Sequence, residues 1–537
     1  MTHGMVVAPQ PEAVDVAADI LCAGGNAVDA AIACALVQGV VDPQMTGIAG
    51  FGSLHLYLPG RGVHEVIDFH GRTPMAATPT MWADLLLGET RDGFGFVLDG
   101  NVNDVGYQSV TTPGSLKAYH EAQMAYGSLP WEAVVEPAIG FAENGFIVRP
   151  QMYWFWTLDD GSGRVPNPQR MKFSAAGRSI YCDANGKLLK VGARLRNSDM
   201  ADTLRRIAAE GADCFYTGAI GREIDADMRA NGGLLSFADL EGYRLRRGPP
   251  LRGRYRGYEI ATNHPPGGGI MLVEMLGVLE HFDLAGLGHN SARYIAVLGE
   301  AMKQATADKD AFVGDPDFVD VPIERLISAE YAAEQAARIR SGHRVRVPRM
   351  NAGETRNTTH LCVRDEHGNA VSLTHSLGSP SGVVTPGLGF MYNGAMGVFD
   401  PRPGRAGSIT PGKSRFSSLC PSILFNQGRP EIIIGAPGGT QIAMGVLQAI
   451  LNLIDHGMSP VEAVTAPRVS ATSDAIDIAN RIPRHVEDEL RSAGYDVIRS
   501  PLSYTIAGVH VISAKGGDPG AWRGGADPAY DGMALGV

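Results

Sequence analysis

The sequence predicts a soluble globular protein that mixes helices and strands. Hydrophobic residues make up 44% of the 537 residues and charged residues 19%, while 68 glycines and 33 prolines indicate many turns. Apolar residues recur with helical spacing through much of the first two-thirds of the chain, and short alternating segments follow residue 358. We therefore expect an α/β-type protein with a large core.

Two helices are predicted near the N-terminus. Pro11 begins the first, which runs over 11–21, and Gly24-Gly25 stops it before Asn26 caps a second, Ala-rich helix. The second helix continues to about Val40. Further elements are expected in this part of the chain: alternating strands over 54–68 around a turn at 59–62, and helices over 115–145 and 292–311.

The character of the chain changes after a polar segment at 351–357, which reads as an exposed connector. Residues 359–364 and 370–376 alternate as two strands, and the Gly-containing segment 365–369 joins them as a hairpin. The last elements expected are strands over 421–425 and 431–434 and a helix over 440–456 that opens after Gly438-Gly439.

Composition restricts the partners. A formal net charge of -11 and a pI near 5.8 argue against nucleic acid or an anionic membrane surface. The N-terminal residues lack a basic stretch followed by an apolar segment, and no apolar run approaches the roughly 20 residues that span a bilayer. We therefore expect a cytoplasmic protein that acts on a small molecule.

Neither a metal nor another cofactor is expected. The six cysteines are scattered without a C-x-x-C motif, so buried reduced thiols are the default. His70, His360 and His375 are not spaced as metal ligands. The sequence also lacks the G-x-S-x-G and H-E-x-x-H motifs of serine-elbow hydrolases and zinc proteases.

Thr358 is the candidate nucleophile. A threonine hydroxyl needs a nearby base, and its own α-amino group can serve once the preceding peptide bond is broken. An α-amino pKa near 8 leaves a useful neutral fraction at physiological pH. Asn357-Thr358 stands at the junction of the connector and a strand, where such a residue would have to lie.

Features downstream of Thr358 strengthen this interpretation. Ser376 ends the second arm of the hairpin, so its hydroxyl is expected beside Thr358. Ser417-Ser418 supplies two adjacent hydroxyls before a strand. Gly438-Gly439 supplies free backbone N–H groups at a helix N-terminus, which suits a developing oxyanion.

These segments resemble the gamma-glutamyltransferase family of N-terminal-nucleophile hydrolases, nearly from end to end. The similar segments are Gly24 to Ala31, Thr112 to Gly114, Pro265 to Gly269, Gly314 to Asp317, Pro437 to Gly439, Ala466 to Arg468 and Ala526 to Pro528.

The resemblance implies an α+β fold, a four-layer αββα sandwich built from two cleavage fragments. Cleavage before Thr358 would give a large subunit, 1–357, and a small subunit, 358–537, which together form one domain and a heterodimer. The resemblance also implies roles for the site residues: Thr358 as nucleophile, Ser376 where the family has a supporting threonine, Ser417 and Ser418 at the substrate, and Gly438 and Gly439 as the oxyanion site. The expected reaction transfers a γ-glutamyl or related acyl group from an amide to water or an amine.

The site departs from the family at the expected carboxylate anchor. Members that use glutathione place an arginine directly after Asp-Phe, whereas here Asp68-Phe69 is followed by His70. Arg72 lies two residues further on, and two residues preserve the facing of a strand. We therefore take His70 and Arg72 as candidate substrate-binding residues, with a surface role as the alternative for Arg72.

The expected ammonium clamp departs further. Asn393, a candidate substrate-binding residue, begins a segment in which no acid precedes Phe399, and Asp400 is displaced past it. Gly378 stands where an asparagine is usual. We infer that the acyl group lacks an α-amino group, as in relatives that hydrolyse oxamate, or that recognition is rebuilt from other residues.

Two rival functions remain. Residues 407–414 fit the G-x-x-x-x-G-K-[ST] pattern of nucleotide-binding loops, but they lack the preceding buried strand and following helix. The second rival is a non-catalytic homologue that acts as a binding module, which the joint presence of Thr358, Ser376 and Gly438-Gly439 argues against.

Overall fold

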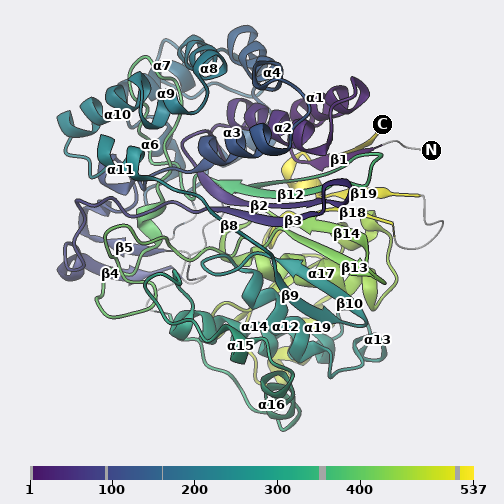
Figure 1. Ribbon diagram of the computed structural model, residues 1–537. Helices are drawn as coiled ribbons and strands as arrows, with labels where there is room; N and C mark the ends of the chain where they lie inside the picture. The colour runs from purple at the N-terminus through teal and green to yellow at the C-terminus, as the bar shows by residue number, and fades with distance from the viewer. Residues whose placement is uncertain are drawn as a thin grey trace.

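The computed structural model describes residues 4–90, 93, 95–159, 161, 163–349, 358–514 and 521–537. Two antiparallel sheets lie face to face, and each carries a layer of helices on its outer side (Figure 1). The predicted αββα sandwich is therefore confirmed. The connector at 351–357, and with it the cleavage-site residue Asn357, lies outside the described residues.

The first sheet has seven strands in the order β20-β1-β11-β12-β2-β3-β8. Their bounds are Met533–Gly536, Met5–Ala8, Thr359–Arg364, Ala370–Ser376, Phe51–Leu58, Val63–Phe69 and Arg246–Gly248. The hairpin predicted after residue 358 is β11 and β12, with the expected bounds. Asp365 closes its turn by accepting hydrogen bonds from the backbone of His367 and Asn369, both at 3.0 Å.

The second sheet has six strands in the order β19-β18-β14-β13-β10-β9. Their bounds are Arg523–Ala526, His510–Ser513, Arg429–Gly435, Ser422–Asn426, Tyr258–Thr262 and Leu251–Tyr255. Small apolar side chains fill the space between the two sheets, among them Val7, Cys362, Ile423 and Ile433. Short additional strands lie outside both sheets: β4 Leu86–Glu89, β5 Phe96–Leu98, β6 Phe146–Ile147, β7 Arg194–Leu195, β15 Val469–Ser470, β16 Ile476–Ile478 and β17 Val497–Arg499.

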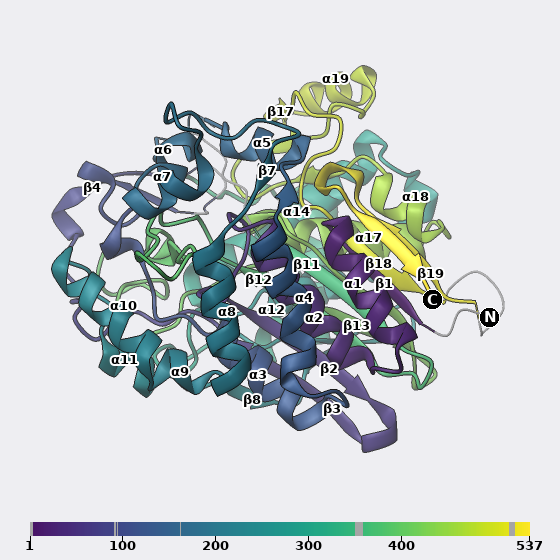
Figure 2. The same ribbon diagram turned by 90° about the horizontal axis from the view of Figure 1, so that it is seen from above.

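The helices preceding residue 243 share a core with the outer face of the seven-stranded sheet (Figure 2). All residues of α2 are buried, and Asn26 caps it in a capping box with Asp29. These helices are α1 Pro11–Cys22, α2 Ala27–Val41, α3 Ser115–Tyr126, α4 Trp131–Asn144, α5 Pro150–Trp156, α6 Asn167–Met171, α7 Ala175–Tyr181, α8 Ser198–Glu210, α9 Asp213–Tyr216, α10 Ala219–Ala230 and α11 Phe237–Gly242.

The later helices share a second core with the outer face of the six-stranded sheet. They are α12 Gly269–Leu279, α13 Leu284–Leu287, α14 Ala292–Phe312, α15 Ile323–Leu326, α16 Ala329–Arg340, α17 Ile442–Ile454, α18 Pro460–Thr465 and α19 Arg484–Ser492. The predicted helix at 440–456 is α17, preceded by a 3-10 turn over Gly439–Gln441.

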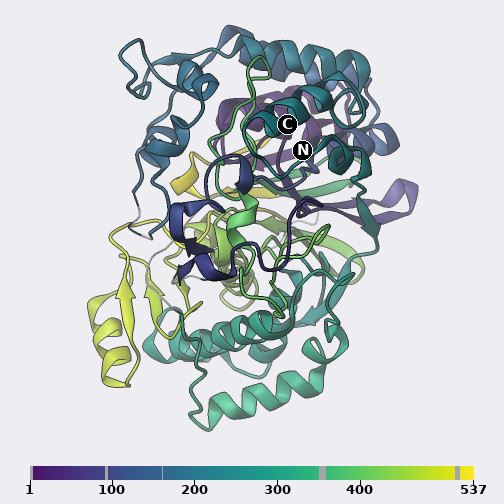
Figure 3. The same ribbon diagram turned by 90° about the vertical axis from the view of Figure 1, so that its left-hand side faces the viewer.

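Both sheets combine strands from before and after residue 358. In the first sheet they interleave, because β11 and β12 lie between β1 and β2. In the second sheet they form two blocks that meet where β13 pairs with β10. The loops at 70–110 and 377–420 gather at one end of the sandwich, which faces the viewer in Figure 3. Gly106 N–H donates to the Ser381 carbonyl at 2.7 Å there, so the two loops are joined directly.

Candidate active site

Four side chains form a row across that end of the seven-stranded sheet, one from each of four neighbouring chain segments: Thr358, Ser376, Phe51 and His70. Ser376 pairs directly with Phe51, and the adjoining pairs of the register bring Thr358 and His70 into line with them. Side-by-side residues on adjacent strands project from the same face. Phe51 packs in the core of the second sheet, so this row faces the space between the sheets.

Thr358 and Ser376 are hydrogen-bonded through their hydroxyl oxygens at 2.9 Å. Thr358 is only 3% exposed, and Gly378 N–H donates to the Ser376 hydroxyl oxygen at 2.8 Å. This second bond leaves the Ser376 hydrogen available to donate to Thr358. The φ angle of Thr358 is 129°, a strained conformation for a β-branched residue.

Gly438 and Gly439 follow β14 and precede α17. Their φ angles are 140° and 60°, and a Cβ on Gly438 would lie 2.6 Å from the Ala507 Cα, so only glycine fits at position 438. Within the described part of the chain, neither amide nitrogen donates a hydrogen bond. The two N–H groups, close to the N-terminus of α17, are suited to hold an oxyanion.

The packing of β11 on β14 relates Thr358 to this glycine pair. The His360 ring lies against Gly435, where a Cβ would come within 2.2 Å of the imidazole. His360 and Thr358 are two residues apart and face the same way, so Thr358 points toward the end of β14. Gly438 and Gly439 begin three residues beyond Gly435, at that same end.

A buried ion pair supports the glycine pair from behind. Arg468 donates to the carbonyls of Ile506 and Ala507 at 2.8 and 2.9 Å, and it also pairs with Asp527. Ile506 and Ala507 both have positive φ, and Ala507 presses on Gly438. The Arg468 and Asp527 segments, noted separately as family-like, therefore meet behind the predicted oxyanion site.

Asp68, His70 and Ser417 form a hydrogen-bonded chain at the other end of the row. His70 Nδ1 lies 2.6 Å from an Asp68 carboxylate oxygen, and His70 Nε2 contacts the Ser417 hydroxyl. Burial would raise the pKa of Asp68, but His70 and then Arg246 hold that pKa below its ordinary value. Asp68 was not identified as a candidate from sequence, although it directly precedes the Phe69-His70 pair.

Ser417 and Ser418 are held by the family-like glycine segment at 265–269. Ser417 N–H donates to the Pro266 carbonyl at 2.9 Å, and a Cβ on Gly268 would clash with the Ser418 backbone at 2.6 Å. The Ser418 hydroxyl is buried and finds no hydrogen-bond partner among the described residues. It is therefore available to a substrate.

The Asn393 side chain is engaged by neighbouring loops. Its amide oxygen accepts from the Thr111 N–H and hydroxyl and from Ala395 N–H, and its amide nitrogen donates to the carbonyls of Ala49 and Thr111. These bonds use the whole capacity of the amide, and the side chain is fully buried. Through these bonds Asn393 joins the segments at Ala49, Thr111 and Ala395.

Arg72 is also directed elsewhere. Its guanidinium donates to the Arg244 carbonyl at 3.0 Å and lies over the Tyr243 ring, on an exposed part of the surface. Its backbone bridges to Thr112 and Ser414. The expectation of preserved strand facing was wrong because β3 ends at Phe69, before Arg72 is reached.

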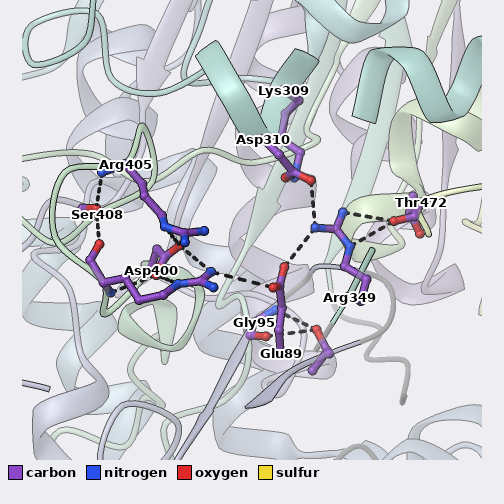
Figure 4. A network of polar contacts seen from close by, with 11 residues as sticks. Glu89, Gly95, Lys309, Asp310, Arg349, Asp400, Arg405, Ser408 and Thr472 are labelled. Atoms are coloured by element: carbon purple, nitrogen blue, oxygen red, sulfur yellow. Dashed lines mark hydrogen bonds and ion pairs between the residues drawn. The ribbon is translucent and has the colours of Figure 1, made fainter. Parts of the chain in front are cut away.

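A cavity of about 610 Å³ lies beside the row, lined in part by Arg415 and Phe416, which directly precede Ser417. Its wall is rich in ion pairs (Figure 4). Arg349 donates to Glu89 at 2.9 Å and to Asp310 at 2.8 Å, and Arg402 pairs with Asp400 at 2.7 Å.

The nucleotide-loop pattern at 407–414 does not form a phosphate-binding loop. Lys413 is buried and donates its ammonium protons to the carbonyls of Ala406 and Ser408 at 2.7 and 3.1 Å. No helix follows the pattern before β13, although residues 414–421 are all described. The structure therefore contradicts the nucleotide-binding alternative.

Among the described residues, no helix combines the length and apolar character needed to cross a membrane, and no group of three metal-ligating side chains lies together. All six cysteines are free. Cys22 is exposed and Cys182 half-buried, so the expectation of buried thiols was wrong at these two positions.

The αββα sandwich and the threonine at the start of a central strand define the class of N-terminal-nucleophile hydrolases. A family profile described as gamma-glutamyltranspeptidase matches residues 13–537. The chain belongs to the gamma-glutamyltranspeptidase family.

The chain is similar to proteins named as acylases and to proteins named as glutathione hydrolases. The chain is 41% identical over 506 residues to acylase ACY 1 proenzyme of Pseudomonas sp. strain SE83, an alignment covering 93% of this chain and 88% of the relative. It is 35% identical over 494 residues to the glutathione hydrolase proenzyme of Escherichia coli K12, covering 87% and 80%. The crystal structure of cephalosporin acylase from Bacillus halodurans superposes with a TM-score of 0.87 at 28% identity, covering 99% and 96%. The protein is thus a self-processing amidohydrolase or acyltransferase, made as a precursor of two subunits.

Proposed function

We propose that Thr358 is the self-released nucleophile of this enzyme and that the preferred acyl group carries no α-ammonium. The observation that carries the first part is the 2.9 Å hydrogen bond between Thr358 and Ser376, at the strand end that faces Gly438 and Gly439. A buried hydroxyl with a hydroxyl partner, facing two unengaged amides, is the arrangement that acyl transfer requires.

Self-processing would begin when the Thr358 hydroxyl attacks the Asn357 carbonyl. The C–N bond breaks as the acyl group passes to the hydroxyl oxygen, which leaves an ester and a free α-amino group on Thr358. Water then hydrolyses the ester and yields the subunits 1–357 and 358–537. The strained φ of 129° at Thr358 favours this step, because cleavage releases the strain.

Turnover would reuse the same groups. The α-amino group of Thr358 takes the hydroxyl proton as the oxygen attacks the substrate amide, and the Gly438 and Gly439 N–H groups stabilise the oxyanion. The proton passes to the departing amine. Water or an acceptor amine then attacks the acyl-enzyme, which restores the threonine hydroxyl and gives hydrolysis or transfer.

Three observations support an acyl group without an α-ammonium. Asn393 has no capacity left for a ligand, and Gly378 offers no side chain where the family usually has an asparagine. A buried ammonium without a partner is costly. The 41% identity to an acylase also favours this reading, and the structural neighbour's name makes an acylated cephalosporin a candidate substrate.

A γ-glutamyl donor is the second candidate, favoured by the 35% identity to a glutathione hydrolase. The site supports it less well because neither Arg72 nor Asn393 faces the row. A non-catalytic role is disfavoured by the intact hydrogen bond of Thr358 and by the unengaged amides of Gly438 and Gly439.

The processing claim is tested on a denaturing gel with N-terminal sequencing. We expect wild type to give two bands, the smaller beginning at Thr358. Thr358→Ala should stay a single band, and Thr358→Ser, which keeps a hydroxyl, should still be cleaved. A single uncleaved wild-type band, or cleavage of the alanine variant, would contradict the assignment of Thr358 as the self-released nucleophile.

The acyl claim is tested with two p-nitroanilides that differ only by the α-ammonium, γ-glutamyl and glutaryl. We expect the glutaryl compound to have the higher kcat/KM. Arg72→Ala should change neither substrate's kinetics, because Arg72 lies outside the site. A micromolar KM for γ-glutamyl-p-nitroanilide, sensitive to Arg72→Ala, would reverse the assignment.

A further inference from the structure

Gln38 of α2 connects the two strands that carry the catalytic hydroxyls. Thr359 directly follows Thr358, and His375 directly precedes Ser376. Because neighbouring residues of a strand project from opposite faces, the side chains of Thr359 and His375 point to the outer face of the sheet, where α2 lies (Figure 1). The fully buried Gln38 amide donates to the Thr359 hydroxyl oxygen at 3.3 Å and lies 2.8 Å from Nε2 of His375. One side chain thus holds the immediate neighbours of both hydroxyls.

The orientation of the Gln38 amide is set from its far side by Asp42. Burial raises the pKa of Asp42 to about 6, so above that pH its carboxylate is ionised and can only accept. The Gln10 amide nitrogen donates to this carboxylate, and the Gln10 oxygen accepts from the Gln38 amide nitrogen at 2.8 Å. The Gln38 oxygen is left to accept from His375, so Nε2 is the protonated nitrogen of that imidazole.

His375 is neutral, and its other ring nitrogen is also engaged. Burial lowers the pKa of His375 to about 3. With the proton on Nε2, the Nδ1 atom accepts from the hydroxyls of Thr46, at 2.9 Å, and Tyr119. Buried polar networks that are fully hydrogen-bonded make their surroundings rigid. This network therefore fixes the end of β12 against the helical layer.

β11 has an incomplete backbone ladder at its catalytic end. On one edge it pairs with β12 along its whole length. On the other edge its register with β1 ends at Cys362, three residues short of Thr359. β1 ends shortly before Gln10, where a φ of 63° turns the chain into α1. The side chains of Gln10 and Gln38 therefore contact Thr359 where a backbone partner is missing.

This contact matters most once Thr358 is an N-terminal residue. In the uncleaved chain, peptide bonds hold Thr358 on both sides. After cleavage only Thr359 holds it, and Thr358 lies one residue beyond the strand. An attacking hydroxyl must be placed accurately, since a misplacement of about 1 Å can cost ~10²-fold in rate. Support at Thr359 therefore affects turnover more than self-cleavage.

We propose that Gln38 is a positioning residue for the reaction, which keeps the N-terminal Thr358 beside Ser376 by holding the residues next to them. The inference rests on the proposed function, since it assumes that Thr358 is the free N-terminal nucleophile. It goes beyond that function by giving a role to a helix residue that touches neither the substrate nor the reacting atoms.

The first test compares cleaved wild type with Gln38→Met, which keeps the length of the side chain and removes its hydrogen bonds. The substrate is whichever of the glutaryl and γ-glutamyl p-nitroanilides wild type hydrolyses faster. We expect kcat to fall ~10- to 100-fold and KM to stay within about threefold, because His70 and Ser417 are left in place. On a gel time course, self-cleavage should slow less than kcat falls.

A double-mutant cycle separates positioning from packing. Thr359→Val keeps the shape of the side chain and removes the hydroxyl that Gln38 holds. Thr359→Val alone should lower kcat and leave KM unchanged. In the Thr359→Val background, Gln38→Met should lower kcat by less than about threefold, because residues that act through one contact are not additive.

Gln123→Met is the matched control. Gln123 lies in α3 of the same helical layer and is 2% exposed. Its amide donates to Asp29 at 2.6 Å and to the Leu129 carbonyl at 2.9 Å. The change therefore also removes buried hydrogen bonds, so it should lower Tm as Gln38→Met does, but it should leave kcat and KM unchanged.

A kcat of Gln38→Met within about threefold of wild type would overturn the proposal, and so would fully additive losses in the double variant or an equal loss of kcat in Gln123→Met. If Gln38→Met does not fold, Thr359→Val decides, because the proposal requires a lower kcat at constant KM. Failure of the proposed function appears differently, as an uncleaved wild-type chain or as no hydrolysis of either anilide.

Discussion

The Asp68 carboxylate lies 2.6 Å from Nδ1 of His70 and also accepts the His70 backbone N–H at 2.8 Å. An ionised carboxylate can only accept, so Nδ1 carries the proton and, in the neutral ring, Nε2 accepts from the Ser417 hydroxyl. Asp68 thereby fixes the direction of the Ser417 hydroxyl hydrogen. It acts through His70 and is a positioning residue that does not itself bind substrate.

Asp68→Asn is expected to weaken acyl-donor binding. An asparagine amide can donate to Nδ1, which would place the proton on Nε2 and turn the Ser417 hydroxyl around. We expect KM to rise about tenfold with kcat changed less than threefold, and self-cleavage to proceed. Steady-state kinetics checks this, and a lower kcat at constant KM would contradict the positioning role.

Ser376→Ala is expected to slow both self-cleavage and turnover. It removes the hydroxyl partner of Thr358 and leaves the nucleophile unoriented. We expect a loss of ~10- to 100-fold in each rate, of the order seen for general acid–base groups. Ser376→Thr keeps the hydroxyl and should remain close to wild type, which a gel time course and an anilide assay would measure.

Gly438→Ala is expected to abolish most of the activity without unfolding the protein. The new Cβ would meet the Ala507 Cα at 2.6 Å and force the φ of 140° to change, which moves the amide away from the oxyanion. Removing one oxyanion donor typically costs ~10²- to 10³-fold in kcat. Gly60→Ala, where nothing lies within 4 Å, serves as the control and should behave as wild type.

Glu274→Gln is expected to stabilise the protein, and its gain in stability over wild type should grow as pH rises. Burial, and then the neighbouring Asp308, raise the pKa of Glu274 in α12 well above its ordinary value. The native state therefore holds a proton that the unfolded chain releases near pH ~4.3, so this contribution to stability is present below that pH and is lost as pH rises toward the native pKa.

The Tm gain of Glu274→Gln over wild type should accordingly be larger at pH 8 than at pH 5. The exposed Glu334→Gln on α16 provides the control and should show no such difference. A gain that is independent of pH would show that the Glu274 carboxyl does not titrate as argued. Activity should be unaffected by either change, because α12 lies on the outer side of the second sheet.

Local patterns predicted the elements well where turn chemistry is explicit. The hairpin over β11 and β12 followed from alternation around a Gly-containing turn, and α2 followed from its Asn26 cap. The short strands β1 and β20 were missed because four residues carry little periodicity. Their pairing with each other and with β11 depends on contacts between distant parts of the chain.

The site was predicted in part for a similar reason. Thr358 and Ser376 lie on one hairpin and are only 18 residues apart, so the local sequence pattern was enough to predict their contact. Asn393 and Arg72 were placed by motif position, and the structure shows their side chains committed to Thr111 and Arg244 instead.

The interleaving of strands within the seven-stranded sheet has a consequence for the cleaved enzyme. With β11 and β12 inserted between β1 and β2, separation of the two subunits would have to break backbone ladders on both flanks. The two subunits share one continuous hydrogen-bonded sheet and do not merely contact each other through their surfaces, so we expect that dilution alone does not dissociate them. Its subunits should come apart only on denaturation, and specific activity should be the same at nanomolar and micromolar enzyme.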